Sequence, residues 1–413
     1  MEQTKDEVIC RINRIFTASF IAILFTGLIN PAVRGTSFIV WKQVLLAFLF
    51  FLAAILVKHK VHRGIAVSFM LSVSVVYILL FISSIRLGSA FVPAYNIFFY
   101  VSWLPFFVWS ANGGGRKFIN SKEKFFFFYI VISCIGLIID LNTDLFLRLN
   151  IRNEVLTMNY FQNHQEIAKR AVFIFTAPTL AISVLGGILV MYLKVNHSML
   201  KLIGSTVTVV IVSITTASLN ALLVGGCFII GCLKYNFRFF IKAIYLVPII
   251  GFLAFFYSQS IMTDTLALQF NRVVGNLDTS SWPNTGRFFH WKTAFQVISD
   301  FSFLEHISGA GIGCTNANYN SHVTHLHGES SLLQAYVEGG MLGVFLRILP
   351  FFLYLKSYLH CKDRCKILIA GYIFGVFVSG AVAPLFGNIP SQALLGVLVG
   401  YQFDLAYETG VKI

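Results

Sequence analysis

The most constraining feature of this sequence is a series of apolar stretches, each long enough to cross a lipid bilayer. The hydrocarbon core of a bilayer is about 30 Å thick, so a crossing helix needs about 20 mostly apolar residues. The chain has 413 residues, of which 57% are hydrophobic and 12% charged, and its mean hydropathy is +0.78. A soluble domain with this composition would leave large apolar patches in water. We therefore expect an integral membrane protein.

Twelve stretches fit the length of a membrane span. They are 15–30, 37–57, 65–85, 91–110, 125–142, 171–193, 202–216, 218–233, 243–260, 331–355, 367–385 and 392–406. No repeat period and no low-complexity linker divides them. We expect an all-α integral membrane fold of about twelve transmembrane helices, forming one domain over residues 1–413. Two longer loops interrupt it, at 143–170 and at 261–330, and we expect the larger to be partly helical.

The distribution of Lys and Arg predicts the orientation of this domain. If the N-terminus is cytoplasmic, the same side receives both termini and the basic connections, which together hold 20 of the 31 Lys and Arg residues. Cytoplasmic loops of membrane proteins carry such an excess. We expect a multi-pass protein of the bacterial inner membrane with both termini cytoplasmic and both long loops periplasmic. The net charge of +14 then serves orientation, and no nucleic-acid partner is needed to explain it.

The larger loop contains a candidate helix on the membrane surface. Phe288, Trp291, Phe295 and Ile298 recur at helical spacing after the turn sequence "PNTG". Such a helix would lie in the membrane interface, with Arg287 in its first turn. The glycine-rich sequence "GAGIG" (309–313) follows it. We do not interpret these glycines as a dinucleotide-binding loop, because no strand precedes them.

Three motifs in this region resemble the O-antigen polymerase and O-antigen ligase superfamily. "NTGRFFHWKTAFQVISDFSFLEHISGAGIG" (284–313) resembles the family's stretch in which an Arg opens a Trp-containing helix and a G-x-G turn follows. "ESSLLQAYVEGGMLG" (329–343) resembles the next element, a polar pair followed by L-Q and E-x-G-x-x-G. "NYFQNHQEIAKRAVFIFTAP" (159–178) is similar to the family's F-x-N-P-N-x-L-A segment, with His164 and Gln165 in place of Pro and Asn. A Ser-Arg pair common in the family is Ser218-Leu219 here.

The resemblance implies a periplasmic glycosyltransferase without a nucleotide-sugar site. Its donor would be a glycan on undecaprenyl diphosphate, and its acceptor hydroxyl would displace the lipid diphosphate with inversion at the anomeric carbon. The polar pair reads Glu329-Ser330, where ligases usually carry His-Asn and many polymerases carry Glu-Ser. This favours the polymerase, which extends a lipid-linked repeat unit. His327 keeps open the ligase, which transfers finished polymer to the lipid A core.

The residue types in the two outer loops suit this chemistry. A departing diphosphate needs its charge neutralised, and the planar fork of Arg holds phosphate oxygens through paired hydrogen bonds. Arg287, Arg152 and Arg272 are suitable in type and placement; the alternative for each is contact with lipid headgroups. We assign Arg287 to catalysis, and Arg152 and Arg272 to substrate binding together with Asn163 and His325.

The acceptor hydroxyl must lose a proton, and a positioned His or carboxylate can accept it. His327 and Glu329 are our candidates for that base. Two alternatives stay open for His325, His327 and Glu329, namely a metal site and a hydrogen-bonded helix entrance. We favour a metal-independent reaction without cofactors. Glu338, inside the following span, is costly in lipid unless paired, so we expect it to face the protein interior, towards Arg347, in a structural role.

A transporter is the competing class, because twelve spans with both termini inside is also a common transporter plan. Transporters place their sites near the membrane midplane between two related halves. In this chain the polar residues gather in one outer loop and no duplication is visible. We therefore favour the enzyme. Its expected partners are the undecaprenyl-diphosphate-linked oligosaccharide and membrane lipid, together with a chain-length regulator and a flippase of the same pathway.

Overall fold

The computed structural model describes about three quarters of the chain, and the regular elements of that part are helices apart from one short β-hairpin. The described residues are 2–32, 40–60, 63–143, 145, 160–162, 165–168, 171, 173–175, 178–195, 198–216, 218–236, 286–315, 330–382 and 388–408. The hairpin pairs β1 (Tyr160–Gln162) with β2 (Gln165–Ala168) in the smaller of the two long loops. The expectation of an all-α membrane fold is thus confirmed except for this hairpin.

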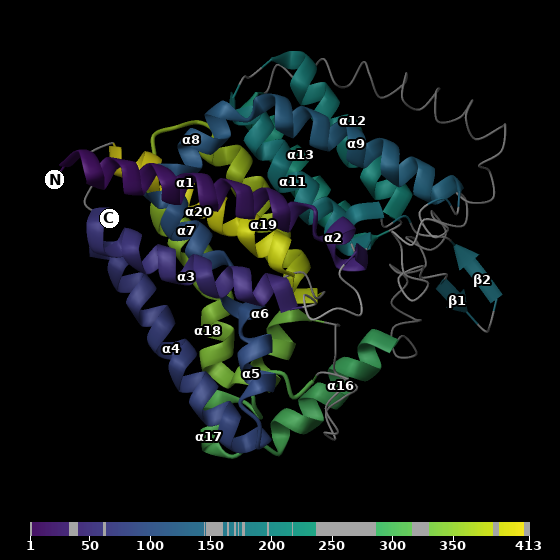
Figure 1. The fold of residues 1–413 in the computed structure, drawn as a ribbon. Helices are drawn as coiled ribbons and strands as arrows, with labels where there is room; N and C mark the ends of the chain where they lie inside the picture. The colour runs from purple at the N-terminus through teal and green to yellow at the C-terminus, as the bar shows by residue number, and fades with distance from the viewer. Residues whose placement is uncertain are drawn as a thin grey trace.

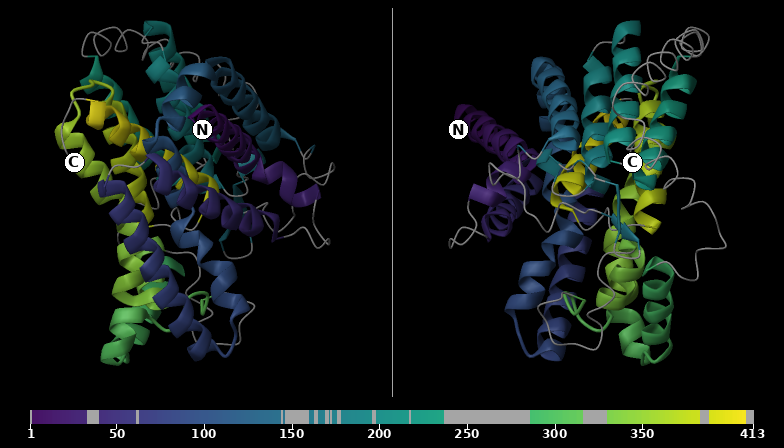
Figure 2. Two further views of the ribbon diagram at one scale, coloured as in Figure 1. Left: turned by 60° about the vertical axis from the view of Figure 1, so that its left-hand side comes forward. Right: turned by 90° about the vertical axis from the view of Figure 1, so that its right-hand side faces the viewer.

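Most helices form one bundle, in which the long helices run in roughly similar directions (Figures 1 and 2). Its helices are α1 (Glu2–Leu24), α2 (Thr26–Ala32), α3 (Trp41–Lys60), α7 (Trp103–Ala111), α8 (Gly114–Ser121), α9 (Glu123–Asn142), α11 (Pro178–Val195), α12 (Met199–Thr216), α13 (Leu219–Tyr235), α19 (Lys366–Val382) and α20 (Ile389–Glu408). A 3₁₀ turn, η3 (Phe173–Phe175), precedes α11.

A smaller lobe extends from one end of the bundle. It is built from the C-terminal part of α4 (Arg63–Leu87), α5 (Phe91–Asn96), α6 (Phe98–Val101), α16 (Gly286–Ser299), α17 (Phe303–Ser308) and part of α18 (Ser331–His360). Phe50, Phe98 and Phe345 pack against both the bundle core and the core of the lobe. The two parts therefore share one continuous apolar interior.

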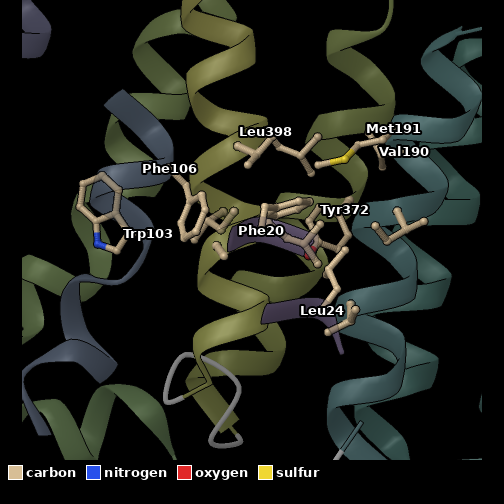
Figure 3. Packing of buried hydrophobic residues seen from close by; sticks show 14 of the residues in the cluster. Phe20, Leu24, Trp103, Phe106, Val190, Met191, Tyr372 and Leu398 are labelled. Atoms are coloured by element: carbon tan, nitrogen blue, oxygen red, sulfur yellow. The ribbon is translucent and has the colours of Figure 1, made fainter. Parts of the chain in front are cut away.

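Glycines allow the central helices of the bundle to approach closely. A Cβ placed on Gly396 of α20 would lie 2.1 Å from the carbonyl oxygen of Trp103 in α7, and one on Gly371 of α19 would lie 2.6 Å from that of Cys227 in α13. Membrane helices associate through such small residues because apolar side chains alone give no preference for protein over lipid. Larger side chains fill the spaces between the helices away from these glycine contacts. Phe20, Phe106, Met191, Tyr372 and Leu398 meet there from five helices (Figure 3).

Four described helices are long and apolar enough to cross a membrane, α3, α4, α9 and α18. A fifth span results if α5 to α7 count as one, with a bend of 42° between Val101 and Trp103. Pro105 explains this bend, because it lacks the N–H that would bond to the Val101 carbonyl. Four shorter apolar helices occur in α11, α12, α13 and α19. The expected span 243–260 lies outside the described residues, so twelve spans remain a prediction.

The structure brings three of the basic connections of the sequence together at one end of the bundle. Arg116 pairs with Glu408 at the end of α20, Lys194 pairs with Asp363, and Lys201 pairs with Glu123. These contacts join the connections 113–124, 194–201 and 356–366 to the C-terminal helix. The cytoplasmic location of this end remains a prediction.

Candidate functional site

The helix α18, which carries the E-x-G-x-x-G motif, reverses direction within the motif. Gly340 has φ 57° and ψ −150°, outside the helical region. A Cβ on Gly343 would lie 2.5 Å from the carbonyl oxygen of Ala335. In a straight helix these residues are more than two turns apart, so the chain must fold back on itself. Residues 331–339 form a first arm and 341–360 a second arm. The predicted span 331–355 is thus part of a helical stretch that is long and apolar enough to cross a membrane, and that stretch is broken at Gly340. Glycine adopts this backbone conformation without strain.

The "GAGIG" sequence forms the turn that closes this reversal. The backbone N–H of Ala310 donates to the Val337 carbonyl at 2.8 Å, and that of Gly311 donates to the Glu338 carbonyl at 3.0 Å. These are the last carbonyls of the first arm, which have no partner within their own helix. Gly309, Gly311 and Gly313 all have positive φ, at 70°, 125° and 88°. Two motifs separated in the sequence are thus one structural unit.

The Glu338 carboxylate lies buried at this junction, with only 2% of the residue exposed. One of its oxygens accepts hydrogen bonds from the Tyr100 hydroxyl at 2.7 Å and from the Gly313 N–H at 3.1 Å. The other oxygen accepts from the Gln334 amide at 3.0 Å and from the Thr315 hydroxyl. A buried carboxylate is stable only when paired or hydrogen-bonded in this way.

Arg347 lies on the second arm and is also buried. Its guanidinium carbon is 4.2 Å from the centre of the Tyr100 ring, whose hydroxyl donates to Glu338. This is the distance of a cation–π contact. Glu338 faces the interior on the same side as Arg347, as expected, and Tyr100 connects the two.

Helix α16 packs against the first arm and runs in the same direction. Ala294 of α16 belongs to one buried cluster with Val337 of the first arm, and Ile298 and Leu333 pack against it. Figure 1 shows α16 running from the bundle side of the lobe towards α17 at its far end. The first arm also ends beside α17, since a Cβ on Gly340 would meet the Ile307 backbone at 2.5 Å. Both helices therefore begin on the side of the lobe that faces the bundle.

Ser330 fixes the start of the first arm. Its hydroxyl accepts a hydrogen bond from the Leu333 N–H at 3.2 Å, as an N-cap, and donates to the Ala381 carbonyl of α19 at 2.6 Å. An N-cap serine satisfies a backbone donor that the helix leaves free. The second residue of the Glu329-Ser330 pair therefore joins the first arm to the end of a bundle helix.

The short helix α17 is held by a complete capping box. Its N-cap residue Ser302 accepts from the Glu305 N–H, while the Glu305 carboxylate accepts from the Ser302 hydroxyl at 2.7 Å and from its N–H at 2.8 Å. These hydrogen bonds from Ser302, together with the charge of Arg86, lower the pKa of Glu305 below its usual value. The capping box fixes how α16 passes into the glycine turn.

The structure covers the catalytic candidates only in part. Arg287 is the second residue of α16, so the expected helix is confirmed with Arg287 in its first turn, and its side chain lies outside the described part. The other candidates lie outside the described residues, namely Arg152, Asn163, Arg272, His325, His327 and Glu329. For His325, His327 and Glu329 the structure places the two residues that border their segment, Thr315 and Ser330.

Three polar residues of the described structure were not among the sequence candidates. Tyr100 lies in an aromatic stretch that gives no sign of a polar role, and Thr315 only follows the glycine turn. Asp140, which is fully buried, accepts a hydrogen bond from the Phe173 N–H at 3.0 Å. An acidic residue near a span end was a detectable signal for Asp140, whereas Tyr100 and Thr315 are recognised only by their contacts with Glu338.

Comparison of the chain with protein-family models, with curated proteins and with solved structures found no match. The class that the fold defines is therefore a multi-helix membrane protein with a lobe built on a reversed helix. Any closer functional assignment depends on the motifs and on their arrangement.

Proposed function

We propose that this protein is an O-antigen polymerase of the bacterial inner membrane, a glycosyltransferase acting at the periplasmic face. The observation that carries the proposal is the parallel packing of α16 on the first arm of α18. One helix carries Arg287 in its first turn and the other directly follows Glu329-Ser330. Two motifs that the sequence resemblance pairs functionally thus lie on neighbouring helices, which share the buried cluster of Ala294 and Val337.

The reaction that fits these residues is an inverting substitution. A sugar hydroxyl of the lipid-linked repeat unit attacks the anomeric carbon of the growing glycan, and the bond from that carbon to the undecaprenyl diphosphate breaks. Glu329 or His327 takes the proton of the attacking hydroxyl. Arg287, with Arg152 and Arg272, neutralises the departing diphosphate. Asn163 and His325 hold the glycan.

The arrangement of the helices favours an anion at this place. A helix N-terminus carries a partial positive charge and free N–H groups, both of which stabilise phosphate. The start of α16 and the start of the first arm contribute two such termini on the same side of the lobe. A diphosphate leaving group therefore suits this end of the lobe in charge.

The experiment is deletion of the gene in its host, followed by analysis of lipopolysaccharide on a silver-stained gel. We expect the deletion strain to show core plus one repeat unit without a ladder, and wild-type protein to restore the ladder. Arg287→Ala and Glu329→Ala should not restore it. Lys292→Ala is the matched control, because Lys292 is an exposed cation on the same helix, and it should restore the ladder fully.

Other outcomes distinguish the alternatives. Core lipopolysaccharide alone, with polymer accumulating on undecaprenyl diphosphate, would identify the ligase. A normal ladder in the deletion strain would exclude both enzymes and favour transport.

A further inference from the structure

We propose that the far end of the lobe is inserted in the membrane, with α17 anchored among the lipid chains of the leaflet opposite the basic connections. The loop 261–330, which holds α17, was expected to lie in the periplasm. The inference concerns the described helices alone and is independent of the proposed reaction.

Helix α4 shows where the membrane lies on the lobe. It has no charged residue between Arg63 and Arg86. Large apolar side chains are exposed along it from Val67 to Ile85, a distance of about 27 Å at 1.5 Å per residue. The hydrocarbon core of a bilayer has about this thickness. We therefore take α4 to face lipid over its whole length, with Ile85 near one boundary of the hydrocarbon.

Helix α17 lies at the same level as this boundary. Figure 1 shows it at the far end of the lobe, beside the C-terminal end of α4. The Ile312 N–H, in the turn that follows α17, donates to the Ser83 hydroxyl of α4 at 2.9 Å. Arg86 also interacts electrostatically with Glu305 of α17.

The second arm of α18 gives the same depth from the opposite direction. It begins beside α17, since Gly340 meets the Ile307 backbone, and it ends at His360 in the basic connection 356–366. At 1.5 Å per residue the arm is about 30 Å long, the thickness of one hydrocarbon core. Two helices therefore place α17 at the membrane boundary opposite the basic connections.

The exposed side chains of α17 suit lipid. Phe303 is 79% exposed and Leu304 is 66% exposed, and Phe91 at the start of α5 is 69% exposed. Exposed apolar patches mark contact with a membrane or with another protein. Here the patch continues the apolar face of α4 past Ile85, which favours the membrane. Glu305 and Arg86 then lie at headgroup level, where charged groups flank inserted side chains.

The interior of the lobe satisfies its polar groups in the way that lipid requires. Hydrocarbon offers no partner to a free backbone group. The Val337 and Glu338 carbonyls at the reversal accept from the glycine turn, and the Glu338 carboxylate accepts four hydrogen bonds. His306 of α17 and Tyr336 of the first arm form a hydrogen bond with each other at 2.8 Å. These contacts allow the reversal to lie within a leaflet.

The test measures the surroundings of a fluorophore on α17 in the full-length protein, embedded in lipid nanodiscs. All seven cysteines lie in the described part of the chain, and only Cys10 is exposed there, so Cys10→Ala is the background for labelling. A nitrobenzoxadiazole group is attached to Phe303→Cys or Leu304→Cys. Ile85→Cys is the matched lipid-facing reference, and Lys362→Cys, exposed in the basic connection, is the aqueous reference. The replaced side chains are exposed, so each variant should keep the wild-type Tm.

Two quenchers report the position of each label. A lipid with a doxyl group near its headgroup should quench the labels at 303 and 304 as strongly as the label at 85. Aqueous iodide should quench them at least about threefold less than the label at 362, because hydrocarbon excludes the anion. A label at Tyr77→Cys, about 12 Å further along α4, should be quenched best by a doxyl group near the end of the lipid chain.

Two results would overturn the inference. Labels at 303 and 304 that iodide quenches as strongly as the label at 362 would place α17 in water and assign its apolar residues to a protein partner. A label at 85 that behaves like the one at 362 would show that the lipid-facing part of α4 ends before Ile85, which removes the boundary on which the placement depends. Neither result depends on whether the protein transfers glycan.

Discussion

The reversal of α18 at Gly340 predicts a strong and position-specific effect of one methyl group. In Gly340→Ala the added Cβ would lie 2.5 Å from the carbonyl carbon of Ile307, 2.6 Å from its oxygen and 2.6 Å from the Ser308 nitrogen. All three are backbone atoms, which cannot move aside by rotating a side chain. The residue would also keep φ 57° and ψ −150°, a conformation that L-residues rarely adopt.

These two effects set the expected magnitude. A non-glycine residue in such a conformation costs about 1–3 kcal/mol. Forcing extra atoms into a packed interior costs about 1–3 kcal/mol more. The closed arrangement of the two arms should therefore lose about 2–6 kcal/mol, which is enough to open the lobe in most molecules.

The neighbouring Gly339→Ala is the matched control. Its Cβ would meet only side-chain carbons, Ile312 Cδ1 at 3.2 Å and the methyl groups of Leu79 at 3.8 Å, and the backbone there is helical. Alanine also gains about 0.5–1 kcal/mol over glycine within a helix. We expect this variant to stay within about 1 kcal/mol of wild type.

The assay is hydrogen–deuterium exchange of the purified full-length protein, with thermal unfolding as a second readout. The amides of Ala310 and Gly311 report closure directly, because both donate to carbonyls of the first arm. In Gly340→Ala they should exchange at least about tenfold faster than in Gly339→Ala, since 1.4 kcal/mol corresponds to a factor of ten. Equal exchange in the two variants would refute the reversal at Gly340.

Three further changes should follow from contacts of other described residues. Gly396→Ala should lower the Tm and the amount of protein in the membrane, because its Cβ would meet the α7 backbone at 2.1 Å; unchanged Tm would contradict the close packing of α7 on α20. Ser330→Ala should cost about 1 kcal/mol through loss of the N-cap and of the bond to Ala381, whereas Ser330→Thr should cost less in the same unfolding assay. Hydrogen bonds from Ser302 lower the pKa of Glu305, so their stabilising effect is present at neutral pH and is lost as pH falls below about 4.5. Hydrogen–deuterium exchange in α17 should therefore become faster below that pH in wild type. It should not become faster in Glu305→Gln, which has no carboxylate to protonate.

The helices of the bundle were largely predictable, because span length is a physical requirement of the bilayer. The position of α16 was also predicted, from the period of its aromatic residues. Its packing face was not. Phe295 is 61% exposed, while Ala294 is 1% exposed and faces the first arm. In an apolar environment, hydrophobicity does not distinguish a side chain facing protein from one facing lipid, and close helix approach selects the small residue.

The sequence predicted the motifs of the candidate site. It did not predict that the "GAGIG" turn binds the end of the first arm of α18. "GAGIG" indicated a turn, since closely spaced glycines usually mark one. A single glycine in an apolar stretch is tolerated in a membrane helix, so Gly340 alone did not indicate a reversal. The reversal depends on the distant turn that supplies N–H groups to Val337 and Glu338. Such long-range pairing leaves no periodic pattern in the sequence.

The reversed helix has a consequence for the biogenesis of the protein. During membrane insertion, Ser331–His360 presents 30 consecutive residues of mostly apolar character, which suits a single transmembrane helix. Its break at Gly340 exposes two backbone carbonyls, and lipid offers no hydrogen-bond donor for them. The donors, Ala310 and Gly311, lie in a loop that must already have crossed the membrane if the predicted topology holds. We therefore expect the chain to insert first as a straight segment and to bend only once that loop has returned to meet it.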